Sequence, residues 1–90
     1  MGAASRGRAD GGPVLDSAGR TLFDELRAPR KRLADKQGVP AYVVFNDRAL
    51  REMAARRPFT REELLEVSGV GPAKLDRYGD AFLEVLRAAS

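Results

Sequence analysis

GVPAYVVFNDRALREMA at residues 38–54 and SGVGPAKLDRYG at residues 68–79 are the two stretches that decide the fold. The first contains the run VPAYVVF, which is too short for a helix, includes a proline and leads directly into a residue that can cap a helix. The second contains a Gly-Val-Gly turn followed at once by a proline and a lysine. We therefore predict an irregular or 3₁₀ connection that plugs into the core, and further along a helical hairpin.

The residues before the first stretch have the apolar spacing of a helix. Leu22 and Leu26 fall on one stripe. Thr21 can cap the helix at its start, and Gly38 can end it. Pro29 lies on the same stripe, and a proline inside a helix costs on the order of 3 kcal/mol. We expect the helix to survive with a kink at the preceding turn.

Three further helical segments follow, each marked by a start signal. Asn46 or Asp47 can cap the first of them. Thr60, with Glu63 three residues later, forms a capping box for the second. Pro72 suits the first turn of the last. The predicted fold class is therefore all-α.

The expected architecture is a compact bundle of four or five short helices. The number depends on whether Gly79 interrupts the last helix or only bends it. Residues 21–90 form the predicted domain. Residues 1–20 hold five of the nine glycines and few large apolar residues, so we expect a disordered tail or an interdomain linker.

The composition excludes several classes of function. The chain has no cysteine and no histidine, which removes disulfides, thiolate metal sites and the usual general base. The 13 acidic residues are scattered, so we expect neither a metal nor another cofactor. No apolar run approaches the roughly 20 residues that cross a bilayer, and the N-terminus lacks a signal peptide. We expect a cytoplasmic, non-catalytic domain.

The charge is divided along the chain. The net charge is +3, with 16 basic and 13 acidic residues. Residues 20–61 hold 11 basic and 5 acidic residues, whereas residues 62–90 hold 3 basic and 6 acidic residues. The basic part favours a polyanionic partner.

One edge of the first helix is a candidate contact for nucleic acid. Arg32 and Lys36 lie four residues apart there, with only Glu25 near them, and the chain reaches Tyr42 six residues later. Cations that end at an aromatic ring suit single-stranded nucleic acid, because phosphates pair with the cations while a base stacks on the ring. The alternative is that Tyr42 belongs to the core.

Two other basic residues are weaker candidates. Arg48 can extend the basic surface, but it can equally pair with Glu52 four residues on, and we favour that pairing. Lys74 follows the Gly-Val-Gly turn, whose backbone amides can receive a phosphate. A purely structural role for that turn is the favoured interpretation.

The last helix carries a row of acids at four-residue spacing, namely Asp76, Asp80 and Glu84. Such a face repels DNA. It is either ordinary solvated surface or a docking surface for a basic partner, such as another domain of the same polypeptide.

Taken in this order and spacing, VPAYVVF and SGVGPAKLDRYG resemble the HRDC domain (helicase and RNase D C-terminal), in the form found at the end of RecQ-type DNA helicases. The resemblance covers residues 21–89. It implies single-stranded DNA contact at Tyr42, whereas Pro29 departs from the family pattern. It also implies a monomeric accessory module that binds single-stranded or junction DNA weakly, meets other domains of the helicase and tunes it. In a bacterium the module would be nucleoid-associated.

Three alternatives remain. The first is an interdomain or protein-interaction module that uses the acidic face and binds little DNA. The second is the same domain in an RNase D-like exonuclease, although VPAYVVF fits the helicase branch better. The third, an autonomous enzyme, is disfavoured because no nucleophile–base pair can be assembled and no phosphate-binding loop is present.

Overall fold

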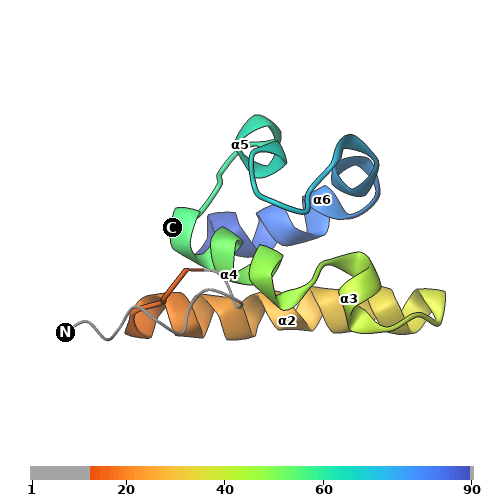
Figure 1. Ribbon diagram of the computed structural model, residues 1–90, viewed down its shortest axis with the longest axis horizontal. Helices are drawn as coiled ribbons and strands as arrows, with labels where there is room; N and C mark the ends of the chain where they lie inside the picture. The colour runs from red at the N-terminus through yellow and green to blue at the C-terminus, as the bar shows by residue number, and fades with distance from the viewer. Residues whose placement is uncertain (1–12, 90) are drawn as a thin grey trace.

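The structure, a computed structural model, describes residues 13–89, which contain five helices and no strand (Figure 1). The helices are α2 (Ser17–Gln37), α3 (Ala41–Val44), α4 (Asp47–Arg56), α5 (Arg61–Leu65) and α6 (Pro72–Ala88). The all-α class is confirmed. The predicted tail falls mainly on residues 1–12, which lie outside the described residues. Within the described part, none of the helices has the length and hydropathy that a bilayer crossing requires.

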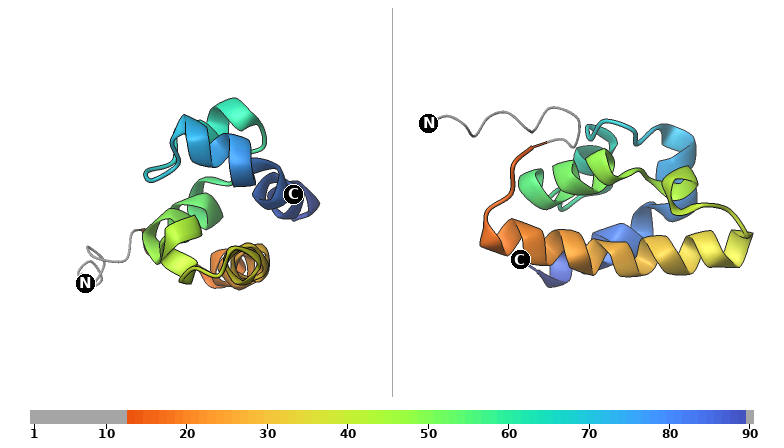
Figure 2. Two further views of the ribbon diagram at one scale, coloured as in Figure 1. Left: turned by 90° about the vertical axis from the view of Figure 1, so that its right-hand side faces the viewer. Right: turned by 60° about the horizontal axis from the view of Figure 1, so that its bottom comes forward.

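The longest helix, α2, runs along one side of the molecule and carries the others. α3, α4 and α6 all pack against it, and α5 packs on α6. α6 runs back along α2, so that its last turn lies near the end where α2 begins (Figure 2). α3 lies beside the opposite half of α2.

The first helix begins at Ser17, so the predicted start at Thr21 is wrong. Its N-cap is Asp16, whose carboxylate accepts a hydrogen bond from the amide of Gly19 at 2.8 Å. Leu15, which we assigned to the tail, is a core residue with 6% of its surface exposed. The first turn has no large apolar residue, and periodicity therefore could not reveal it.

α2 continues through Pro29, as predicted, and Figure 1 draws it as one uninterrupted ribbon. The proline ring is among the largest fully buried side chains. Burial of apolar surface therefore offsets the backbone hydrogen bond that a proline cannot donate. The expected kink stays a prediction.

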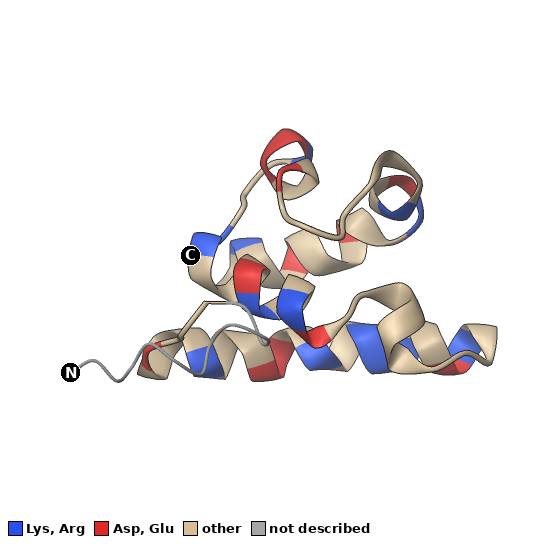
Figure 3. Cartoon of the chain, in the orientation of Figure 1, with Lys and Arg blue, Asp and Glu red and all other residues tan. Residues whose placement is uncertain are grey.

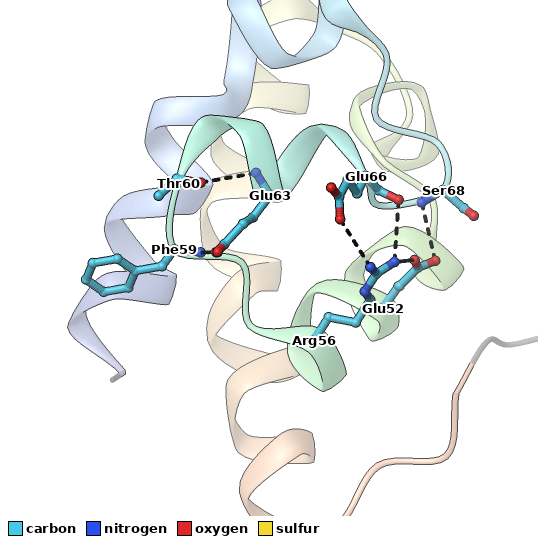
Figure 4. Close-up of polar contacts among 7 residues, drawn as sticks. All are labelled: Glu52, Arg56, Phe59, Thr60, Glu63, Glu66 and Ser68. Carbon is cyan, nitrogen blue, oxygen red and sulfur yellow. Dashed lines mark hydrogen bonds and ion pairs between the residues drawn. The ribbon is translucent and has the colours of Figure 1, made fainter.

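The expected helix starts are confirmed by hydrogen bonds at two caps. The side chain of Asn46 accepts from the amide of Ala49 at 2.9 Å. The Thr60 hydroxyl accepts from the amide of Glu63 at 3.1 Å (Figure 4). The Glu63 carboxylate reaches back to the amide of Phe59 at 2.7 Å, one residue earlier than in the standard capping box.

α6 is one helix, because Gly79 does not divide it. Pro72 is its first residue, as predicted. A Cβ atom at Gly79 would lie 2.7 Å from Cδ1 of Leu75 and 3.7 Å from Cδ2 of Leu64. The missing side chain therefore leaves room for the side chain of Leu75, one turn earlier in α6, to lie against Gly79.

The connection after α2 is a single turn of α-helix, α3, and not the 3₁₀ or irregular segment that we predicted. Its role as a plug is confirmed, because Val44 and Phe45 are 0% and 1% exposed. The Phe45 ring meets the edges of two aromatic rings of α6, with centroid separations of 5.0 Å to Phe82 and 5.9 Å to Tyr78. α3 therefore joins α2 to α6 through the core.

Arg57, which caps α4 at its C-terminal end, is expected to gain from replacement by glycine. Its φ of +51° lies in the left-handed region, which costs a non-glycine residue about 1–2 kcal/mol. Glycine removes that strain but loses more backbone entropy on folding, so Arg57→Gly is expected to raise the free energy of unfolding by about 0.5–1 kcal/mol. Urea denaturation measures it.

The opposite substitution, from glycine to a residue with a side chain, can be made at Gly38. It caps α2 at φ +70°, and a Cβ atom there would meet nothing within 4 Å. Gly38→Ala is therefore expected to lower the free energy of unfolding by about 1 kcal/mol through backbone conformation alone. If both variants changed stability in the same direction, the left-handed caps would not be the cause.

Candidate nucleic-acid interface

Tyr42 lies outside the core. It is 68% exposed, whereas Val44, two residues later, is fully buried. In a single helical turn, residues two apart point to nearly opposite sides, so the inward Val44 directs Tyr42 to solvent. The alternative in which Tyr42 forms part of the core plug is therefore wrong.

The crest of α3 separates two open grooves. Ala41 lines one and Val43 lines the other, and Tyr42 stands between them. We name them for the helices they join. The α2–α3 groove is lined mainly by Arg27, Arg30, Lys31, Ala34, Asp35, Val39, Pro40 and Ala41. The α3–α6 groove is lined by Gln37, Val43, Ala73, Lys74, Asp76, Arg77 and Tyr78.

The α3–α6 groove offers two cations. Lys74 is half-buried, and its Nζ lies 5.8 Å from the centroid of the Phe45 ring, an arrangement that holds the ammonium over the core. Arg77 is exposed and makes no ion pair within residues 13–89. The one acid of this groove, Asp76, is held by Arg61 at 3.1 Å.

A partly buried hydrogen bond joins two residues that line the same groove. The side-chain amide of Gln37 donates to the hydroxyl of Tyr78 at 2.7 Å, which joins the last residue of α2 to α6. Tyr78 is only 4% exposed, so its hydroxyl needs such a partner. The groove therefore keeps a defined shape.

The cations of the α2–α3 groove are largely neutralised by neighbouring acids of α2. Lys31 and Asp35 form an ion pair at 3.1 Å, and Arg27 lies 4.0 Å from Asp24. All four side chains are more than half exposed, and each pair is worth a few tenths of a kcal/mol.

Arg32 and Lys36 are both exposed, and neither makes an ion pair with any residue that the structure describes. However, the α2–α3 groove is lined by Arg27 and Lys31, so the edge of α2 that meets α3 is not the edge that carries Arg32 and Lys36. Lys36, in the last turn of α2, is not among the residues that line either groove.

The pairing of Arg48 with Glu52 is not formed, so our favoured interpretation of Arg48 is wrong. Glu52 binds Arg56 at 2.9 Å and accepts a hydrogen bond from the amide of Ser68 at 3.3 Å (Figure 4). A glutamate placed four residues before its basic partner has the favourable orientation along a helix. Arg48 is exposed and has no ion pair within residues 13–89.

The acidic face of α6 contains an arginine that the sequence analysis did not place there. Arg61 of α5 binds Asp76 at 3.1 Å and Asp80 at 2.9 Å. Of the three predicted docking acids, only Glu84 is exposed without an ion pair in the described part of the chain. The face is therefore less negative than its sequence indicates.

The sequence analysis also missed Arg30, the only charged residue buried within residues 13–89. One of its nitrogens donates to the carbonyl of Phe45 at 3.0 Å and binds the carboxylate of Asp47 at 2.8 Å. Arg30 lies four residues after Leu26 and four before Ala34, which are both buried. That spacing could have placed it on the buried stripe, but we assigned the stripe from apolar residues alone.

The chemistry available at this surface is binding. In the described part of the chain, no three side chains gather that could hold a metal ion. What the site offers is an exposed ring, cations on either side of it and a groove with a defined shape.

Comparisons with known proteins agree with this architecture. The profile of the HRDC domain family matches residues 20–86. The ATP-dependent DNA helicase RecQ of Pasteurella multocida is 44% identical over 68 residues, which are 76% of this chain and 11% of that protein. The ATP-dependent DNA helicase UvrD2 of Mycobacterium tuberculosis is 38% identical over 66 residues, 73% of this chain and 9% of that protein.

A solved structure is similar throughout the bundle. HRDC domain 3 of D. radiodurans RecQ superposes with a TM-score of 0.76 at 36% identity, covering 80% of this chain and 95% of that one. By contrast, the chain spans only about a tenth of the length of the helicases that it matches.

Proposed function

The chain belongs to the HRDC domain family, and from that premise we propose that it is an accessory nucleic-acid-binding and regulatory module of a RecQ-like DNA helicase. It would bind single-stranded or junction DNA weakly and tune which structures the motor engages. ATP hydrolysis would take place in other domains of the parent protein. The observation that carries the proposal is the 68% exposed ring of Tyr42, held at the crest between two grooves.

The charges around the ring support single-stranded DNA as the ligand. Lys74 and Arg77 line the α3–α6 groove, and Lys36 is exposed in the last turn of α2; no described carboxylate forms an ion pair with any of the three. A base stacked on the ring would contribute about 1–3 kcal/mol, while its flanking phosphates meet these cations. Arg48, in the first turn of α4, would extend the basic surface, whereas Arg32 lies on an edge of α2 that does not meet α3.

The competing interaction module is less well supported. It depends on the acidic face of α6, but Asp76 and Asp80 already hold Arg61. A basic partner would have to displace that arginine. A UvrD-like parent helicase is a nearer alternative than an exonuclease, because UvrD2 is among the relatives.

Tyr42→Ala is expected to weaken binding of a single-stranded oligonucleotide by roughly 5- to 150-fold, the equivalent of about 1–3 kcal/mol. The fold should be unchanged, because the ring is largely exposed. Fluorescence anisotropy with a labelled oligonucleotide measures binding, and thermal melting checks the fold. Tyr42→Phe should bind nearly as well as the parent. Phe59→Ala, which removes another half-exposed ring, should bind equally well.

The same titration tests the electrostatic part. With two to four phosphate contacts, the slope of log K against log salt should be about −1.5 to −3 for single strands, at roughly 0.7 per phosphate. An affinity that does not change with salt, or a Tyr42→Ala variant that binds like the parent, would contradict the proposal.

A further inference from the structure

A second basic surface lies along the contact between α2 and α4, on the other side of α3 from the α3–α6 groove. It consists of four arginines, which we call the arginine seam: Arg20 and Arg27 of α2 with Arg48 and Arg51 of α4. Figure 3 shows basic positions on both helices where α4 lies over α2.

Two contacts fix how these helices face each other. The Arg51 guanidinium lies 5.2 Å from the centroid of the Phe23 ring, and Asp47 binds Arg30 at 2.8 Å. α4 therefore runs antiparallel to α2. The two pairs of seam arginines come from adjacent surfaces of these two helices.

The guanidiniums of the seam have few acidic partners. Arg48 and Arg51 make no ion pair within residues 13–89, and Arg20 donates only to the carbonyl of Leu15 at 3.3 Å. Arg27 has one long ion pair, 4.0 Å to Asp24, with both side chains more than half exposed.

The nearest other acids of these helices are already engaged. Asp16 caps α2, and Asp47 is held by Arg30. Glu52 binds Arg56 on the side of α4 that faces the loop before Ser68. The seam arginines therefore keep hydrogen-bond donors that the neighbouring carboxylates do not occupy. These donors are available to the oxygens of an anionic partner.

We propose that the arginine seam binds the phosphate backbone of duplex DNA, so that the module grips a junction, with the single strand at Tyr42 and the duplex at the seam. This deepens the proposed function and rests on it. The seam has no free ring for stacking, because Arg51 covers Phe23. It therefore suits paired strands, whose bases are stacked already and whose outer surface is phosphate.

The dimensions fit two strands. Arg20 and Arg27 are separated by two helical turns, about 10 Å along α2, and packed helices lie about 8–10 Å apart. These spans are of the same order as the roughly 6 Å and 12 Å widths of the two DNA grooves. Only Phe45 and Asn46 separate α3, which carries Tyr42, from α4, which carries Arg48 and Arg51.

The experiment compares single-stranded, blunt duplex and forked oligonucleotides in salt titrations of the whole chain. The double variant Arg20→Gln/Arg51→Gln is expected to bind duplex about tenfold more weakly, with the salt slope reduced by about 1.8, at 0.9 per phosphate. Its affinity for the single strand should stay within about twofold of the parent. Arg87→Gln likewise removes one charge and one cation–π contact with a phenylalanine ring, and is the matched control for Arg51→Gln alone.

The pattern across variants separates the two proposals. If Tyr42→Ala loses single-strand binding but the double variant keeps duplex binding, the seam proposal fails and the proposed function stands. If Arg87→Gln weakens duplex binding as much as Arg51→Gln does, net charge is the cause and the seam proposal fails. Preference of the seam for a polyglutamate peptide over duplex would likewise overturn it. If no variant changes any affinity, both proposals fail.

Discussion

Replacing Phe45 with alanine is expected to lower the free energy of unfolding by about 3–5 kcal/mol. The ring is 1% exposed and contacts the edges of Phe82 and Tyr78. Its loss leaves a cavity between α2, α3 and α6 and removes two aromatic contacts, each worth about 0.5–1.5 kcal/mol beyond burial. A domain of 90 residues has a total stability of roughly 5–13 kcal/mol. Urea denaturation should therefore show a much lower midpoint.

Phe59 supplies the matched control, because it is the same residue type at 50% exposure. Its ring contacts the Arg87 guanidinium at 5.6 Å, a cation–π contact worth about 0.5–1 kcal/mol at the surface. Phe59→Ala should therefore cost about 1 kcal/mol. Phe45→Leu keeps most of the volume and should cost under about 1.5 kcal/mol. Equal losses for the two alanine variants would show that Phe45 does not hold the bundle together.

Arg30→Ala is expected to lower the free energy of unfolding by about 2–3 kcal/mol. The substitution leaves the buried carbonyl of Phe45 without its donor, which costs about 1–3 kcal/mol. It also breaks the ion pair with Asp47, whose contribution is modest because that carboxylate is 68% exposed. Packing of the arginine stem against the core is lost as well. Chemical denaturation at neutral pH measures the sum.

Arg32→Ala is the control for this experiment. Arg32 is an exposed arginine two residues later in the same helix and has no ion pair in the described structure, so its loss should change stability by no more than about 0.5 kcal/mol. Arg30→Lys keeps the charge but not the planar fork, and should fall between the two. If Arg30→Ala were as stable as Arg32→Ala, the contacts of Arg30 would have no net stabilising effect.

Features that depend on neighbouring residues were predictable from the sequence. Asn46, Thr60 and Pro72 mark helix starts through interactions within one turn. Gly38 adopts a positive φ of 70°, in agreement with its predicted position at the end of a helix. Local sequence failed in the first turn of α2, where the signal was weak, and at α3, a helical turn that we predicted as 3₁₀ or irregular.

Side-chain partners across helices could not be predicted in the same way. Arg61 meets Asp76 and Asp80 only because α5 folds onto α6, 15 and 19 residues away in the chain. Glu52 could pair with either Arg48 or Arg56 along α4. It also accepts a hydrogen bond from the amide of Ser68, and this contact favours the side of α4 on which Arg56 lies. Such choices depend on tertiary packing, which a helical wheel does not contain.

The same difference between local features and contacts across helices applies to the candidate site. Exposure of Tyr42 agrees with what its sequence context implied. The neighbours of the ring were harder to predict, because the spacing of Arg32 and Lys36 identifies an edge of α2 but not which helix packs beside it. Arg77 was missed because its place in the α3–α6 groove depends on how α6 packs beside Gln37 and Val43.

The return of α6 to the end where α2 begins has a mechanical consequence (Figure 2). A linker could be joined to the domain at that end. Tyr42 would then lie near the opposite end of α2, at a distance of roughly 30 Å, which is the length of a 21-residue helix. Small rotations of the domain about that linker would then move Tyr42 over large distances. The exposed ring of Tyr42 would then reach many positions around the point of attachment without any change in the fold of the domain.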